Sequence, residues 1–221
     1  MTKSIKNAIV IGATGLVGKA LIEQLQQNPN CEKITAIVRR ESADFKHLSK
    51  VEQFVIEDFL LLNDQDVSGY SHAFSCLGST IKKAGSKQAF YNIDFEINAH
   101  FADLFEMTET HFLLVSALGA SASSPIFYNQ VKGKLEQYIQ KLDLYRISIL
   151  QPSLLIGERQ EKRTMEGAMQ SAYLKVSHLV PNSFKYKPVT ADQVAHTMVE
   201  AAQTQTENFE IYDNLRILNA Q

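Results

Sequence analysis

The chain has 221 residues, 45% hydrophobic and 21% charged, which is enough for one sizeable core and excludes a disordered or fibrous chain. Its net charge of −2, without a basic stretch, argues against a nucleic-acid partner, and no apolar run reaches the roughly 18 residues that a membrane span needs. The scattered histidines argue against a metal site, and two distant cysteines, Cys31 and Cys76, favour a reduced, cytoplasmic setting.

Apolar runs of strand length alternate with helical patterns through the first two thirds of the chain. Strands this apolar are typically buried on both faces, as parallel strands are, and alternation with helices implies right-handed crossovers. The sequence therefore predicts an α/β fold, a Rossmann-type doubly wound parallel sheet. The expected strands cover residues 8–11, 34–38, 51–56, 73–77, 111–116, 145–150 and 209–212, and the expected helices cover 16–27, 87–107 and 127–142.

The last third of the chain is too short for a separate large domain. It holds a charged stretch at 158–163, a weakly amphipathic segment at 165–178 and a further helix that opens at Thr190, with Gln193 spaced to complete a capping box. We therefore predict one domain over 1–221, with residues of about 152–208 forming a small lid. The lid would cover the carboxyl edge of the sheet, where ligands bind in such folds.

A glycine-rich turn follows the first expected strand directly and opens the first expected helix. Gly12, Gly15 and Gly18 are spaced G-x-x-G-x-x-G, and such glycines permit a tight turn, a close approach of backbone to pyrophosphate and close packing of helix on strand. The helix N-terminus offers free N–H groups to phosphates. The turn predicts a dinucleotide site, and the alternative is a flexible turn without a ligand. The missing Gly-Lys-Ser/Thr ending excludes a mononucleotide P-loop.

Two arginines, Arg39 and Arg40, end the second expected strand about 20 residues beyond the glycines, where an acidic residue would bind the ribose of NAD. A guanidinium can pair with the 2′-phosphate of NADP and stack on adenine. We therefore expect NADP as the cofactor. A solvated pair of surface charges is the alternative, and Glu41 keeps NAD as a second choice.

Tyr128 and Lys132 are four residues apart in an expected helix, so they share a face beside its apolar stripe. An ammonium beside a phenol favours the phenolate and can also bond a ribose hydroxyl. Ser116 closes the fifth expected strand, where its hydroxyl could hold a substrate carbonyl. These three residues are the candidate catalytic set. The spacing alone is common by chance, and the alternative is an amphipathic Tyr at the core edge beside a snorkelling Lys.

Together, the glycine turn, Ser116 and the Tyr128/Lys132 pair resemble the short-chain dehydrogenase/reductase superfamily, in its extended and atypical branches. More specifically, the chain resembles the Tat-interacting oxidoreductase-like group of NADPH-binding proteins, over nearly its whole length. The segments that carry this resemblance are 76–80, 83–85, 93–94, 116–120, 128–133 and 159–161, of which Cys76-Leu77-Gly78 and Arg159-Gln160-Glu161 are the most specific.

The resemblance implies a role for each residue that matches the family pattern. It assigns the pyrophosphate to the glycine turn, the 2′-phosphate to Arg39 and Arg40, and the nicotinamide ribose to Tyr128 and Lys132. Gln151, Ala117 and Leu118 depart from the polar pattern expected of relatives, and they lie towards the substrate. The remaining implied cofactor contacts are Gly12, Thr14, Gly15, Leu16, Val17 and Gly18 in the turn, Asp58 and Phe59 at the adenine, Cys76, Leu77 and Gly78 at the adenosine and ribose, and Pro152, Ser153 and Leu154 near the nicotinamide amide.

Three functions fit these residues. The first is an NADP-dependent oxidoreductase that acts on an unidentified small molecule, with Tyr128 as the general acid, Lys132 tuning it and Ser116 orienting the carbonyl. The second is an NADPH-loaded binding or sensor protein with a protein partner, which the small tail favours. The third, an isomerase or epimerase with tightly held NAD, fits the superfamily but not the arginine pair. A monomer or a homodimer fits the sequence equally well.

Overall fold

The computed structural model describes residues 4–156, 181 and 183–220, and it has the predicted doubly wound architecture. Seven strands form one sheet in the order β3-β2-β1-β4-β5-β6-β9, and every neighbouring pair is parallel. The strands are β1 (Ile5–Ile11), β2 (Cys31–Val38), β3 (Val51–Val55), β4 (His72–Ser75), β5 (His111–Val115), β6 (Arg146–Gln151) and β9 (Phe209–Asp213), and β7 (Leu155–Ile156) pairs with β8 (Val189–Thr190) separately.

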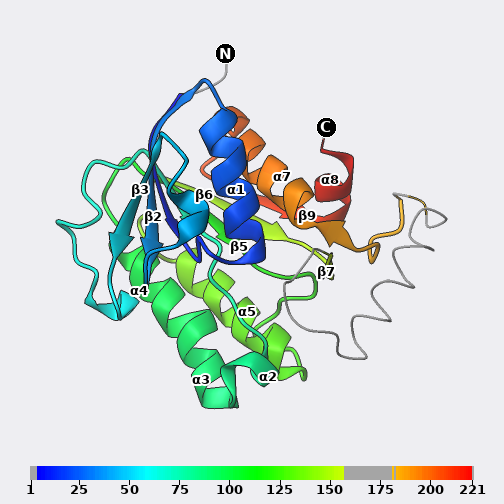
Figure 1. The fold of residues 1–221 in the computed structure, drawn as a ribbon. Coiled ribbons are helices and arrows are strands. Elements are labelled where there is room, and N and C mark those ends of the chain that lie inside the picture. Colours follow the sequence, from blue (N-terminus) through cyan, green and yellow to red (C-terminus); the bar gives the residue numbers. More distant parts are fainter. Residues whose placement is uncertain (1–3, 157–180, 182, 221) are drawn as a thin grey trace.

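Helices cover both faces of the sheet (Figure 1). On one face, α1 (Leu16–Gln27), α7 (Ala191–Thr204) and α8 (Asn214–Asn219) pack into a core with Val10, Leu113 and Leu150. On the other face, α4 (Ile97–Asp103) and α5 (Phe127–Ile139) pack on Ile9, Phe112 and Ile149. Alternate residues of the central strands thus enter opposite cores, which explains why these strands are apolar throughout.

The segment expected as one helix over 87–107 is divided. It begins as α3 (Lys87–Tyr91), passes through a π-helical turn (Asn92–Glu96), continues as α4, and follows the short α2 (Ile81–Ala84). The side-chain amide of Asn98 donates to the carbonyl oxygen of Ile93, inside this turn, at 2.9 Å. A π-helical turn inside a helix is frequent at functional sites, and this turn faces the cavity described below.

The C-terminal part of the chain confirms the helix cap that the sequence predicts at Thr190. Thr190 and Gln193 form the predicted capping box at the start of α7. This helix packs beside α1, so the final part of the expected 152–208 lid is a helix that flanks the sheet. The charged stretch at 158–163, including Arg159-Gln160-Glu161, and the amphipathic segment at 165–178 lie outside the described residues. Among the described helices, none is long and apolar enough to cross a membrane.

Candidate functional site

The carboxyl edge of the sheet opens into a cavity of about 950 Å³. It lies where the order of the strands reverses, since β1 is hydrogen-bonded to both β2 and β4, and ligands of open α/β sheets bind at such a point. Most of the predicted site residues line this cavity: Thr14, Gly15, Leu16, Val17, Cys76, Leu77, Gly78, Ser116, Tyr128, Lys132, Pro152, Ser153 and Leu154.

The glycine turn forms one wall of the cavity. Gly12 has φ +70°, and a Cβ there would lie 2.4 Å from the carbonyl carbon of Cys76, so only glycine fits below the loop after β4. A Cβ at Gly18 would lie 2.3 Å from the carbonyl oxygen of Gly12. Gly15 is the N-cap residue of α1, and no side chain accepts a hydrogen bond from the N–H groups of the first turn. These N–H groups therefore remain available to bind an anion. This cradle fits the pyrophosphate of a dinucleotide.

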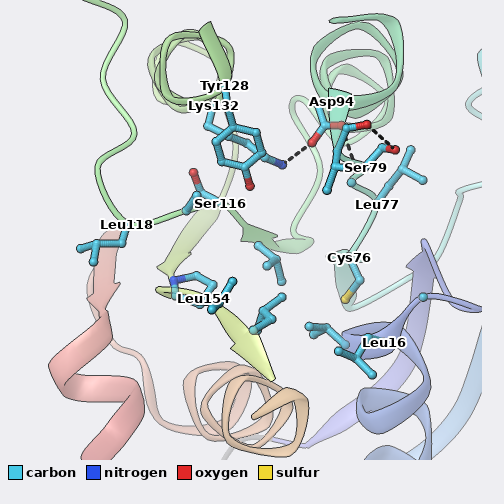
Figure 2. Close-up of a pocket in the computed structure, with 18 of the residues that line it drawn as sticks. Leu16, Cys76, Leu77, Ser79, Asp94, Ser116, Leu118, Tyr128, Lys132 and Leu154 are labelled. Atoms are coloured by element: carbon cyan, nitrogen blue, oxygen red, sulfur yellow. Dashed lines mark hydrogen bonds and ion pairs between the residues drawn. The ribbon is translucent and has the colours of Figure 1, made fainter. Parts of the chain in front are cut away.

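The candidate catalytic side chains meet at the opposite wall (Figure 2). Tyr128 and Lys132 extend from α5, and the ring of Tyr128 packs against the buried ring of Phe90 with centroids 5.5 Å apart. Ser116, at the end of β5, is 4% exposed. The predicted set of Ser116, Tyr128 and Lys132 therefore lies at one end of the cavity.

Lys132 has a partner that the sequence did not predict. Its ammonium lies 2.8 Å from Oδ1 of Asp94 in the π-helical turn, and the side chains of Lys132 and Asp94 are only 4% and 0% exposed (Figure 2). The other oxygen of Asp94 accepts the backbone N–H of Ser79 at 2.8 Å. Asp94 thus connects the loop after β4 to the helix that carries Tyr128.

Burial affects the ionisation of both partners. Desolvation tends to lower the pKa of Lys132, but Asp94, Tyr128 and Glu136 together outweigh it, and the pKa lies above its usual value. Desolvation likewise raises the pKa of Asp94, although the ammonium and the N–H of Ser79 oppose the rise. We treat the pair as ammonium and carboxylate because Asp94 accepts two hydrogen-bond donors, one of them charged.

Ser116 also has an unexpected partner. Its hydroxyl donates to the carboxylate of Glu136, which is 6% exposed and lies one turn beyond Lys132 on α5. The side-chain amide of Gln151 donates to both oxygens of Glu136, at 3.1 and 3.0 Å. Burial raises the pKa of Glu136, while Ser116, Gln151 and Lys132 oppose the rise.

Six predicted cofactor residues do not line the cavity, and two of them, Gly12 and Gly18, lie in the glycine turn itself. Arg39 and Arg40 are exposed just beyond β2. Asp58 accepts the backbone N–H of Leu60 and so caps its own short turn, while Phe59 is buried in the core. The assignment of the other four residues to the 2′-phosphate and the adenine remains a prediction.

Several lining residues were absent from the predicted site. Asp94 had a visible signal: it stands among Phe90, Ile97 and Phe101 on an apolar helical face, where a carboxylate needs a cation. Cys76 contributes shape rather than chemistry, because burial raises the pKa of its thiol to about 12 and keeps it protonated. The other lining residues that were not predicted are Lys19, Ser79, Thr80, Lys83, Val115, Ala117, Leu118, Leu155 and Tyr186.

Comparisons with known proteins support a nicotinamide-dinucleotide-binding fold. Residues 7–94 match the NAD-binding domain of semialdehyde dehydrogenases. The fold is similar to UDP-glucuronic acid 4-epimerase from Bacillus cereus in complex with NAD, with 14% identity, 93% of this chain and 76% of that chain covered, and a TM-score of 0.67. It is also similar to the PhqB reductase domain from Penicillium fellutanum, with 15% identity, 96% and 67% covered, and a TM-score of 0.65.

Two curated relatives are similar over most of their length. Protein FMP52-1, mitochondrial, from Scheffersomyces stipitis is 34% identical over 206 residues, which cover 92% of this chain and 90% of the relative. Protein HTATIP2 from Rattus norvegicus is 33% identical over 165 residues, which cover 73% and 67%.

The expected cytoplasmic location is wrong. Several of the relatives, from Scheffersomyces stipitis, Meyerozyma guilliermondii and Candida albicans, are named mitochondrial proteins. The expectation rested on Cys31 and Cys76, which are both free, and free thiols indicate a reducing environment without identifying one compartment. The fold is an NAD(P)-binding, oxidoreductase-like fold, and the chain belongs to the family of the FMP52 and HTATIP2 proteins.

Proposed function

We propose that the protein uses NADPH to reduce the carbonyl group of a small molecule. The observation that carries the proposal is the single cavity in which the phosphate cradle at Gly15 faces Tyr128 and Lys132. One end therefore suits a pyrophosphate and the other a reacting carbonyl.

Each residue has a distinct role in this proposal. The hydroxyl of Tyr128 would donate a proton to the carbonyl oxygen as the general acid. Lys132, whose charge Asp94 balances, would bond the nicotinamide ribose, and Ser116 would orient the substrate oxygen. The cofactor, when bound, supplies the hydride.

The preference for NADPH over NADH rests on the arginines. Arg39 and Arg40 are exposed directly after β2, the strand that pairs with β1 and its glycine turn, and a 2′-phosphate would extend towards them. Glu41, the residue that would favour NADH, is exposed and lies 3.6 Å from the ammonium of Lys46, which partly offsets its charge. The positive charges of Arg39 and Arg40 would attract the phosphates of NADPH.

The substrate end of the cavity favours an uncharged compound. The described residues that line the cavity on the substrate side of Tyr128 carry no charge. They are Ala117, Leu118, Pro152, Leu154, Leu155 and Tyr186. Oxidation of NADPH should therefore be faster with hexanal or benzaldehyde than with succinic semialdehyde or glyoxylate. The measurement is the loss of NADPH absorbance against an enzyme-free blank. Rates equal to the blank with every compound would contradict a reductase.

A regulatory protein that binds NADPH without efficient chemistry is the second candidate. Two contacts favour it: Ser116 donates its proton to Glu136, and Lys132 is paired with Asp94, so both are engaged within the protein. Tight NADPH binding with blank rates on the carbonyl panel would select this function. The names of the fungal relatives lead us to propose a mitochondrial location in either case.

A further inference from the structure

The candidate catalytic serine belongs to a three-residue cluster, in which Ser116 and Glu136 are buried and Gln151 is half-buried. The cluster consists of Ser116 at the end of β5, Glu136 on α5 and Gln151 at the end of β6, so it joins two neighbouring strands to the helix that carries Tyr128. Glu136 does not line the cavity, whereas its hydrogen-bond partner Ser116 does. Its position suits control of the serine hydroxyl rather than contact with a ligand.

The number of protons in the cluster limits what Ser116 can do. A serine hydroxyl has one proton, and an ionised carboxylate only accepts hydrogen bonds. The amide of Gln151 already donates to both oxygens of Glu136, and Ser116 donates to Oε1. While Glu136 is ionised, the proton of Ser116 is therefore directed away from the cavity, and the hydroxyl cannot donate to a substrate oxygen.

Protonation of Glu136 reverses this bond. The carboxyl O–H then donates to Oγ of Ser116, while Oε2 still accepts from Gln151. We propose that Glu136 is a positioning residue, which releases the hydroxyl of Ser116 towards the substrate oxygen when it is protonated and withdraws it when it is ionised. This inference rests on the proposed reductase function and adds its dependence on pH.

The surroundings of Glu136 permit both states. The charged group that acts on it is Lys132, one turn earlier on α5, and Asp94 of the π-helical turn balances that charge at 2.8 Å. The groups that face it from the strands, Ser116 and Gln151, are neutral. Burial raises the pKa of the carboxyl group, so protonation persists to higher pH than for an exposed glutamate.

Glu136→Gln tests the inference because its amide is a permanent donor to Ser116 and still accepts from Gln151. The probe reaction is the reduction of benzaldehyde by NADPH. For the wild type, kcat/KM should fall with rising pH by about tenfold per pH unit above the pKa of Glu136. The variant should lose this fall and hold its low-pH rate across the same range, and Ser116→Ala should be slow and flat. A wild-type fall that persists in Glu136→Gln would overturn the inference.

A second measurement needs no turnover. A carboxyl group with a raised pKa in the folded state binds protons that the unfolded chain releases, so stability falls as pH rises from the ordinary value of 4.5 to the raised one. The melting temperature of the wild type minus that of Glu136→Gln should fall over this range. The fall should extend to higher pH when both proteins carry Ser116→Ala, because the hydroxyl of Ser116 opposes the rise in the pKa of Glu136. If neither protein reduces benzaldehyde although NADPH binds, the reductase proposal fails. In that case a fall that Ser116→Ala alters still supports the coupling of Glu136 to Ser116, and a constant difference, or a fall that Ser116→Ala leaves unchanged, overturns it.

Discussion

Tyr128→Phe is expected to lower kcat for carbonyl reduction by about 10²–10⁴-fold, which is the usual contribution of a positioned general acid. Phenylalanine keeps the ring that packs against Phe90 at 5.5 Å but lacks the hydroxyl. The Kd for NADPH should therefore stay close to that of the wild type. Steady-state kinetics and calorimetry on the same preparation measure the two effects separately.

Tyr138→Phe is the matched control. This tyrosine lies on the same helix and donates to Asp103 at 2.9 Å, away from the cavity. Its replacement removes the same atom and should leave kcat unchanged. Wild-type turnover by Tyr128→Phe, or an equal loss in both variants, would show that the phenol of Tyr128 is not the acid.

Asp94→Asn is expected to destabilise the protein by about 3–5 kcal/mol, because it leaves the buried ammonium of Lys132 without its counter-charge. The two side chains are 0% and 4% exposed, so water from the cavity that they line replaces the lost partner only in part. Denaturant unfolding measures the change. Asn keeps an oxygen for the N–H of Ser79, which restricts the loss mainly to the ion pair.

Two further variants control this result. Asp94→Asn/Lys132→Met removes both charges and should recover most of the lost stability. Asp44→Asn breaks the exposed ion pair with Lys19 and should leave the free energy of unfolding nearly unchanged. A stability of Asp94→Asn equal to that of the wild type would mean that the ammonium of Lys132 is not buried or not charged.

The sequence was sufficient for the parts of the fold that depend on local pattern. The apolar strands, the helix after Gly15 and the capping box of Thr190 each follow from spacing within a few residues, and the structure contains all of them. The glycine turn could be interpreted in the same way, because steric limits at Gly12 and Gly18 act on adjacent backbone.

The contacts that define the chemistry could not be predicted in this way. Asp94 meets Lys132, and Ser116 meets Glu136, across separate elements, so no spacing rule predicts either pair. The π-helical turn was missed because the helical pattern around it is continuous, and the amide of Asn98 stabilises the wider turn. Asp58 and Phe59 were assigned by resemblance, and their local partners in the structure are a backbone N–H and the core.

The most direct test of the account is a calorimetric titration of the apo protein with NADPH and, separately, with NADH. We predict clear preference for NADPH. Arg39→Ala/Arg40→Ala should lose most of it, on the order of tenfold to a hundredfold in the Kd for NADPH, since hydrogen bonds to charged groups contribute about 1.5–3 kcal/mol. The control Lys6→Ala/Lys33→Ala removes two positive charges near the amino ends of β1 and β2, at the edge of the sheet away from Arg39 and Arg40. It should keep the preference for NADPH. Preference for NADH would contradict the arginine assignment and favour an epimerase, and binding of neither cofactor would contradict the dinucleotide site itself.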